Sequence, residues 1–267
     1  MRKKSEMVWG VIFRLFVVVF AAASLIMLQG LSEGLEPWVQ SFLATSPLPD
    51  ELRFHAASHG ALIGILFSFS LLAMLRDPLS KPVLLQFYIV GHLIFLAVLA
   101  VTDPVLAKQT FFVFIMFAIV LATLYATYPN RREIWRSTEP RVVNRTLLLL
   151  TGGVLLALLP VIIGGISGQL QDPEQQFRWG EGSALAITLV YAAYLTATAR
   201  TGTRTLGVIQ GLTYVYMGAA SLTLPQYPGS WGLWGGTAAI IFGILYPVIV
   251  FREHARHSLQ LEQVRAG

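Results

Sequence analysis

Cysteine is absent from this chain of 267 residues. Its absence excludes disulfides, thiolate metal sites, iron–sulfur clusters, covalently attached c-type haem and cysteine nucleophiles. Charged side chains are also scarce, because they make up 12% of the residues against 55% for hydrophobic side chains. A water-soluble domain carries about 25% charged residues. So few charges cannot cover a surface in water, and we therefore expect lipid to be the main solvent of this protein.

The hydrophobic residues are gathered in long runs. A helix that crosses the roughly 30 Å of hydrocarbon in a bilayer needs about 20 mostly apolar residues, and eight runs reach or approach that length. The sequence thus predicts an all-α, polytopic integral membrane bundle of about eight transmembrane helices in one domain, residues 1–267. Pro160 is expected to kink or end the fifth helix. The predicted spans are residues 8–28, 56–75, 83–101, 110–125, 146–166, 183–199, 206–224 and 231–251.

The last two spans form a single uncharged stretch between Arg204 and Arg252. One helix of that length would measure about 70 Å at 1.5 Å per residue, which is far more than a bilayer. The segment Pro225–Trp231 contains two prolines and a glycine, which favour a turn. We predict two helices joined there, with small residues such as Gly236 and Gly243 allowing close packing of the last helix.

The positive charges predict the orientation. With eight spans and a cytoplasmic N-terminus, 16 of the 19 Lys and Arg residues fall on the cytoplasmic side, which satisfies the positive-inside rule. We therefore predict a multi-pass protein of the cell (inner) membrane with both termini in the cytoplasm. The first apolar run continues past Ala21–Ala23 to Leu28, which favours a retained anchor over a cleaved signal peptide. The expected partners are the lipid bilayer and other membrane subunits, and no nucleic acid.

One element is predicted outside the membrane. Apolar residues recur at helical spacing after Ser32, a predicted N-cap, so we expect a short interfacial helix in the first external loop. It would either pack over the bundle or act as a lid over an outward-facing cavity. Its apolar residues are Leu35, Trp38, Val39, Phe42 and Leu43.

A metal site is one candidate for chemistry. Glu51, His55 and His59 are spaced four residues apart, so they would share one helical face at the outer start of the second span. Imidazole and carboxylate ligands at this spacing suit a divalent ion such as zinc. The alternative is that they are interfacial polar residues that bond to headgroups, water or Ser58.

Haem is a second candidate cofactor, with His59 and His92 as axial ligands. At 1.5 Å per residue His92 lies about 14 Å above the cytoplasmic edge and His59 about 24 Å above it, a mismatch in depth that counts against haem. His92 alone suits a proton relay or a ligand contact, or it hydrogen-bonds a neighbouring helix.

A ligand cavity is the third candidate. Gln210 and Tyr214 share one face of the seventh span, and with Tyr191, Tyr194 and His92 they would line a polar cavity among the second, third, sixth and seventh helices. Ordinary hydrogen bonding between helices is the alternative. No Asp or Glu lies deep in a span, which argues against transport driven by protons or sodium and against a buried general base. We therefore favour a non-enzymatic role in ligand binding, transport or a membrane complex, and keep a metal- or haem-binding enzyme as the alternative.

Overall fold

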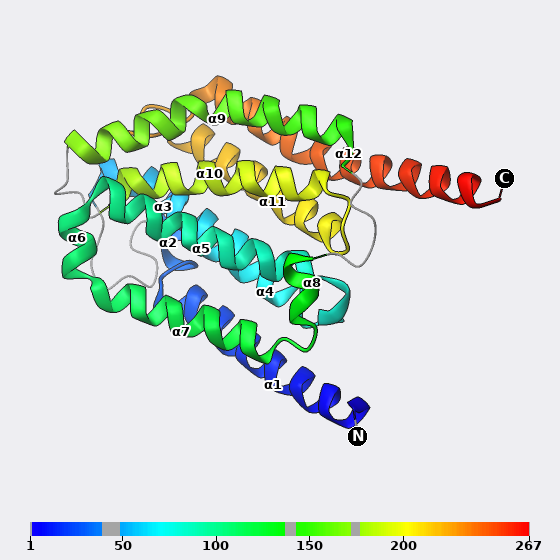
Figure 1. Cartoon of the computed structure of the whole chain (residues 1–267). Helices are drawn as coiled ribbons and strands as arrows, with labels where there is room; N and C mark the ends of the chain where they lie inside the picture. The colour runs from blue at the N-terminus through cyan, green and yellow to red at the C-terminus, as the bar shows by residue number, and fades with distance from the viewer. Residues whose placement is uncertain (1, 39–48, 137–142, 172–176, 267) are drawn as a thin grey trace.

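A computed structural model of the chain describes residues 2–38, 49–136, 143–171 and 177–266. Within these residues all regular secondary structure is helical, which confirms the all-α part of the predicted fold class. Figure 1 shows the long helices lying side by side in one bundle. They are α1 (Arg2–Ala22), α3 (Arg53–His59) with α4 (Ser68–Leu72), α5 (Pro82–Thr102), α7 (Phe111–Thr127), α9 (Arg145–Gln171), α10 (Arg178–Ala197), α11 (Thr203–Thr223) and α12 (Gly232–Ala266).

Shorter elements extend or connect these helices. A π-helical turn, Ala23–Met27, continues α1, and a longer one, Gly60–Phe67, joins α3 to α4 into one continuous helix. The connecting elements are α2 (Ser32–Leu35), α6 (Pro104–Gln109), α8 (Arg131–Trp135) and the 3₁₀ turns Asp50–Leu52 and Pro78–Ser80.

Each of the eight predicted apolar runs forms a helix. In the described part of the chain, five helices are long and apolar enough to cross a membrane: Met7–Met27, Arg53–Leu72, Pro82–Thr102, Arg145–Gln171 and Gly232–Arg256. Helix α7 is apolar but shorter. The chain is therefore a helical membrane protein.

Two helices run beyond their predicted ends. Helix α9 continues through Pro160 to Gln171, and α12 continues through Pro247 to Ala266. A proline removes only one intrahelical hydrogen bond, and helices in membranes tolerate that loss. The end of the apolar run also does not end α12, because the residues after Phe251 are mostly good helix formers.

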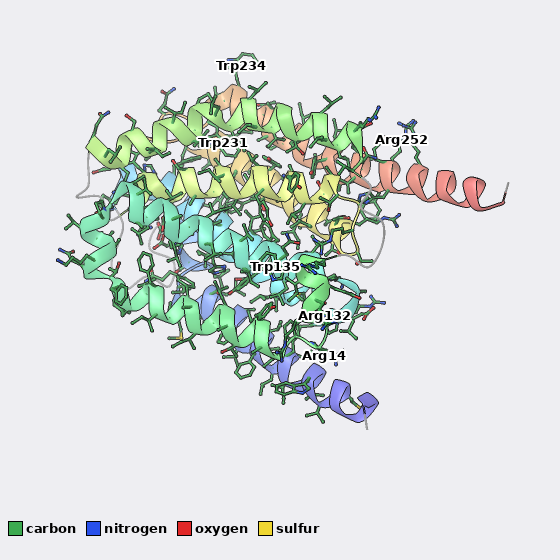
Figure 2. All side chains as sticks on the ribbon, viewed as in Figure 1. Arg14, Arg132, Trp135, Trp231, Trp234 and Arg252 are labelled. Carbon is green, nitrogen blue, oxygen red and sulfur yellow. The ribbon has the colours of Figure 1, made fainter. Side chains whose placement is uncertain are left out.

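The outer faces of the bundle are apolar. Of the most apolar stretch in each helix, 78% is buried for Arg53–Leu72, but only 22% for both Met7–Met27 and Arg145–Gln171. Large apolar side chains such as Leu149 and Trp234 are strongly exposed on α9 and α12, and Figure 2 shows Trp234 projecting away from the bundle. Apolar surface on this scale indicates contact with lipid.

Helices α11 and α12 approach each other closely through glycine. A Cβ atom on Gly211 would lie 2.6 Å from the carbonyl oxygen of Gly243, and one on Gly218 would lie 2.6 Å from that of Gly236. This contact confirms the predicted role of Gly236 and Gly243. The turn before α12 also forms as predicted, with a positive φ of 77° at Gly229.

The two chain ends lie at the same end of the bundle (Figure 1). Arg14, Arg132 and Arg252 lie toward that end as well (Figure 2). These three of the basic residues that the sequence assigns to one side of the membrane thus lie toward one end of the bundle.

The predicted interfacial helix is only partly covered by the structure. Helix α2 includes Leu35, but Val39, Phe42 and Leu43 lie outside the described residues. Ser32 is not an N-cap, because its hydroxyl donates backwards to the carbonyl of Gln29. The indole N–H of Trp38 donates to Thr223 Oγ1 at 3.0 Å, which attaches this segment to the end of α11.

Candidate functional site

A cavity of about 710 Å³ lies between the pair α9–α10 and the pair α11–α12. Volumes of this size are typical of sites that bind small molecules. Most of its wall is apolar. The lining includes Leu150, Gly153, Val154, Ala157, Leu158, Pro160, Val161, Gly164 and Gly165 of α9, Trp179, Gly182 and Leu185 of α10, Tyr214 of α11, Gly235, Ala238, Ala239 and Phe242 of α12, Phe54, His55 and Ser58 of α3, and Gly229, Ser230 and Trp231 before α12.

His55 is the polar group that this cavity leaves without a partner. Its side chain is 2% exposed, and its Nε2 atom is buried with no hydrogen-bond partner. The ring stands edge-on to Trp179, with 4.6 Å between ring centroids. On another side a Cβ added to Gly229 would come within 2.9 Å of the ring, so glycine is needed for this approach. Trp179 and Gly229 therefore pack directly against the imidazole.

Three other polar side chains of the lining have hydrogen-bond partners within the protein. The Ser58 hydroxyl donates to the carbonyl of Phe54, and the Ser230 hydroxyl accepts from the backbone N–H of Gly232. The Tyr214 hydroxyl accepts from Gln210 Nε2 at 3.5 Å. An unpartnered buried nitrogen costs free energy, so a ligand group that reached His55 Nε2 by a shift of the ring would be stabilised there.

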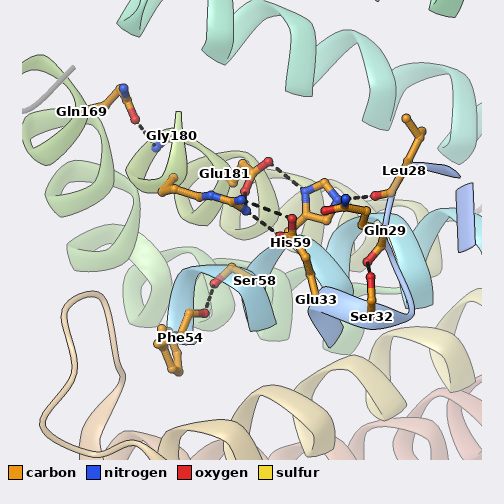
Figure 3. A network of polar contacts seen from close by, with 11 residues as sticks. Leu28, Gln29, Ser32, Glu33, Phe54, Ser58, His59, Gln169, Gly180 and Glu181 are labelled. Carbon is orange, nitrogen blue, oxygen red and sulfur yellow. Dashed lines mark hydrogen bonds and ion pairs between the residues drawn. The ribbon is translucent and has the colours of Figure 1, made fainter. Parts of the chain in front are cut away.

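A buried cluster of four charges lies beside the cavity (Figure 3). Arg178 makes a two-point contact with Glu33, at 2.5 and 3.2 Å, and lies 3.7 Å from Glu181 Oε2. The Oε1 atom of Glu181 lies 2.8 Å from His59 Nδ1, and the Nε2 atom of His59 donates to the carbonyl of Leu28 at 2.7 Å. The cluster thus joins α2, α3 and α10.

The contacts of His59 indicate its charge. A carbonyl accepts hydrogen bonds only, so Nε2 carries a proton, and an ionised Glu181 requires one on Nδ1 as well. With a protonated His59, two positive and two negative groups balance in the cluster. Buried charges occur paired in this way because an unpaired one is costly. The cluster has the properties of a structural brace.

The predicted metal site is not assembled. Glu51 is exposed, and His59 uses both ring nitrogens in the charge cluster. In the ranges that the structure describes, no group of three or more His, Asp or Glu side chains is placed to hold a metal ion. Helical spacing alone brought these residues onto one face, but Glu181, which is distant in sequence, satisfies His59.

His92 lies away from the cavity. Its ring stacks on Phe67 with 4.0 Å between centroids, and it also contacts Tyr88 and Phe117. Its Nδ1 donates to the Tyr88 carbonyl one turn earlier in α5. Aromatic rings therefore surround the imidazole. Neither of the two predicted haem ligands, His59 and His92, lines the cavity.

The structure places only some of the predicted cavity residues at the cavity. Tyr214 lines the cavity, but Gln210, Tyr191 and Tyr194 do not. Gln210 is fully buried and donates to the carbonyl of Leu189, Tyr191 accepts from Gln86 Nε2, and Tyr194 is 47% exposed. The cavity involves the second, fifth, sixth, seventh and eighth long helices rather than the predicted second, third, sixth and seventh.

Sequence reasoning missed the contribution of α9. Pro160 was expected only to kink or end this helix, whereas Gly153, Pro160 and Gly164 form one wall of the cavity. The available signal was the small residues Gly153, Ala157 and Gly164, which recur along one face of this helix.

The bundle and its cavity define the class of this chain: a helical membrane protein with a mostly apolar cavity. Comparisons with protein-family models, with curated proteins and with solved structures find no match.

Proposed function

We propose that this chain is a multi-pass protein of the cell membrane that binds an apolar ligand in the cavity between α9–α10 and α11–α12, without catalysing a reaction. It crosses the bilayer eight times and has both termini in the cytoplasm. The observation that carries the binding role is the cavity of about 710 Å³, whose lining includes His55 with its buried, unpartnered Nε2.

Eight crossings are supported by the lengths of the two most polar long helices. Helix α10 has 20 residues and α11 has 21, so each extends about 30 Å, the thickness of the hydrocarbon core. Their low hydropathy comes from polar residues that face the bundle interior, such as Gln210, Thr213 and Ser183, all fully buried. Polar groups in that position do not contact lipid.

The cytoplasmic orientation is supported by the basic end of the bundle. Lys and Arg residues accumulate on the cytoplasmic side of membrane proteins. The end that carries Arg14, Arg132 and Arg252 also carries both chain termini (Figure 2).

A binding role is favoured over acid–base catalysis by the lining. Among the described residues of the wall, His55 and Tyr214 are the titratable side chains, and they lie on different helices without a contact between them. General acid–base catalysis needs a proton donor and acceptor within reach of one reacting group. Binding requires only shape and an anchoring polar group.

A dye-binding experiment tests the proposal. The neutral apolar fluorophore 1-aminoanthracene is titrated into the protein in mild detergent, with emission as the signal. Gly153 lines the cavity, and a Cβ there would meet no atom within 4 Å, so Gly153→Leu is chosen to reduce the cavity volume. We expect saturable binding that this substitution weakens by about tenfold or more.

Gly152→Leu is the matched control. Gly152 is the adjacent residue of α9, it also has no atom within 4 Å of its Cβ position, and it does not line the cavity. It should leave dye binding unchanged. Absence of saturable binding, or equal losses in both variants, would overturn the proposed function.

A further inference from the structure

The cavity is elongated along α9. Its α9 wall extends from Leu150 to Gly165, which corresponds to about 22 Å at 1.5 Å per residue. This is most of the roughly 30 Å hydrocarbon core. A compact ligand would leave much of such a cavity empty, whereas an extended chain would contact its whole length.

The polar and apolar parts of the cavity are separated along this length. His55, Trp179, Ser230 and Trp231 lie at the end where α9 finishes and α12 begins. The opposite end is lined by apolar side chains such as Leu150 and Phe242, apart from the Tyr214 hydroxyl, which is already hydrogen-bonded. A ligand that matches this wall has one polar end and a long apolar tail.

One side of the cavity opens onto the apolar flank of the bundle. The α9 residues Gly153, Ala157, Pro160 and Gly164 line the cavity and are also exposed, as is Ala238 of α12. Helix α9 packs chiefly on α10, and α12 packs chiefly on α11, so little closes the space between α9 and α12. The opening therefore faces the region where bilayer-dissolved molecules are found.

From these observations we infer the class of ligand, and the inference rests on the proposed function because it concerns the same cavity. The ligand is a single-chain amphiphile, dissolved in the bilayer, whose tail lies along α9. Its uncharged hydroxyl head lies at the His55 end of the cavity and hydrogen-bonds to Nε2 once the imidazole turns toward the cavity.

The uncharged head follows from the surrounding charges. The groups nearest to His55 are Arg178, Glu181, Glu33 and His59, and these four are paired with one another. No cation among them is left for a carboxylate or phosphate head. A hydroxyl both donates and accepts, so it can pair with His55 Nε2 in either tautomer.

Displacement of 1-aminoanthracene tests the ligand class. Hexadecan-1-ol, hexadecanoate and hexadecane are each added at equal mole fraction in the detergent micelle, and the loss of dye emission is recorded. We expect hexadecan-1-ol to displace the dye most strongly. Hexadecane has the same tail without the head, and hexadecanoate replaces the uncharged head with an anionic one.

His55→Phe tests the position of the head. Phenylalanine keeps a flat ring against Trp179 and removes the nitrogen. The affinity for hexadecan-1-ol should fall about fivefold to tenfold, as expected for one buried hydrogen bond, while the affinities for dye and hexadecane stay the same. Retained dye binding shows in the same titration that the variant is folded.

The outcomes separate this inference from the proposed function. Saturable dye binding that hexadecan-1-ol does not displace would overturn the amphiphile and leave the binding role standing. Stronger displacement by hexadecanoate would overturn the uncharged head. Displacement by hexadecan-1-ol that is equal in the wild type and His55→Phe would overturn the contact with His55. Failure of the dye itself to bind would remove the proposed function first.

Discussion

At the scale of single residues, His55 and His59 show how different two histidines on one helical face can be. They lie one turn apart on α3, yet His59 has both nitrogens paired and His55 has a buried nitrogen without a partner. The difference arises from α10, which directs Glu181 toward one imidazole and Trp179 toward the other. His59 thus belongs to a brace, and His55 is available to a ligand.

The buried charge cluster predicts a large effect of Glu181→Gln on stability. The change removes the carboxylate that faces both His59 and Arg178, and breaking a buried ion pair costs about 3 kcal/mol or more. Thermal unfolding in detergent should show a clearly lower midpoint. Glu51→Gln is the control, because Glu51 is exposed, and it should leave the midpoint unchanged. Equal midpoints for the two variants would contradict the structural role of the cluster.

His92→Phe should have little effect on either stability or binding. A phenyl ring preserves the stacking on Phe67 and loses a hydrogen bond to a carbonyl of the same helix, a change of about 1 kcal/mol. Thermal unfolding and dye titration measure the two properties separately. Lost dye binding with an unchanged unfolding midpoint would instead assign His92 to the functional site.

At the scale of elements, the pair α11–α12 depends on close backbone approach. Gly211 faces Gly243, and Gly218 faces Gly236, so the two helices touch where side chains would otherwise separate them. On its cavity side the same α12 presents Gly235 and Ala238. Small residues therefore have two functions in this helix, tight packing on one face and open volume on another.

Gly218→Val should push α12 away from α11. A Cβ there would lie 2.6 Å from the Gly236 carbonyl oxygen and 3.0 Å from the backbone nitrogen of Ile240, neither of which can rotate away. Overpacking of this kind costs about 1–3 kcal/mol. The thermal unfolding midpoint should fall for Gly218→Val and stay constant for Gly152→Val, which enters open space. A midpoint equal to that of the control would show that the two helices separate without cost.

At the scale of the whole molecule, the number of crossings decides the orientation of every loop. Because the chain contains no cysteine, a single introduced cysteine is the only thiol that a maleimide reagent can label, and its labelling shows on which side of the membrane it lies. Thr201, Gln226 and Gln171 are exposed sites at the ends of α10, α11 and α9. They bracket the two long helices whose composition is the most polar.

Eight crossings predict opposite labelling of these sites in intact cells. A membrane-impermeant maleimide should react with Gln226→Cys and Gln171→Cys, and with Thr201→Cys only after the membrane is permeabilised. Labelling of Thr201→Cys and Gln226→Cys from the same side would show that α11 does not cross. Labelling of Thr201→Cys and Gln171→Cys from the same side would show that α10 does not cross the membrane.

The sequence by itself determined the helices of this protein. Long apolar runs can satisfy their backbone in lipid only as helices, so each predicted run appears as one, and the prolines and glycine before Trp231 separate α11 from α12. The close packing through Gly236 and Gly243 was also visible, because small residues at four-residue spacing have one geometric consequence.

Only the tertiary structure decided which of these helices enclose a cavity and which histidine remains unpaired. Glu181 and His59 are 122 residues apart, and His55 and Gly229 meet across the bundle, so no local pattern relates them. In lipid the apolar surface of a helix does not determine its neighbours, because the tails around it are as apolar as the helix itself. Shape complementarity and a few polar contacts select the neighbours, and these exist only once the helices are packed.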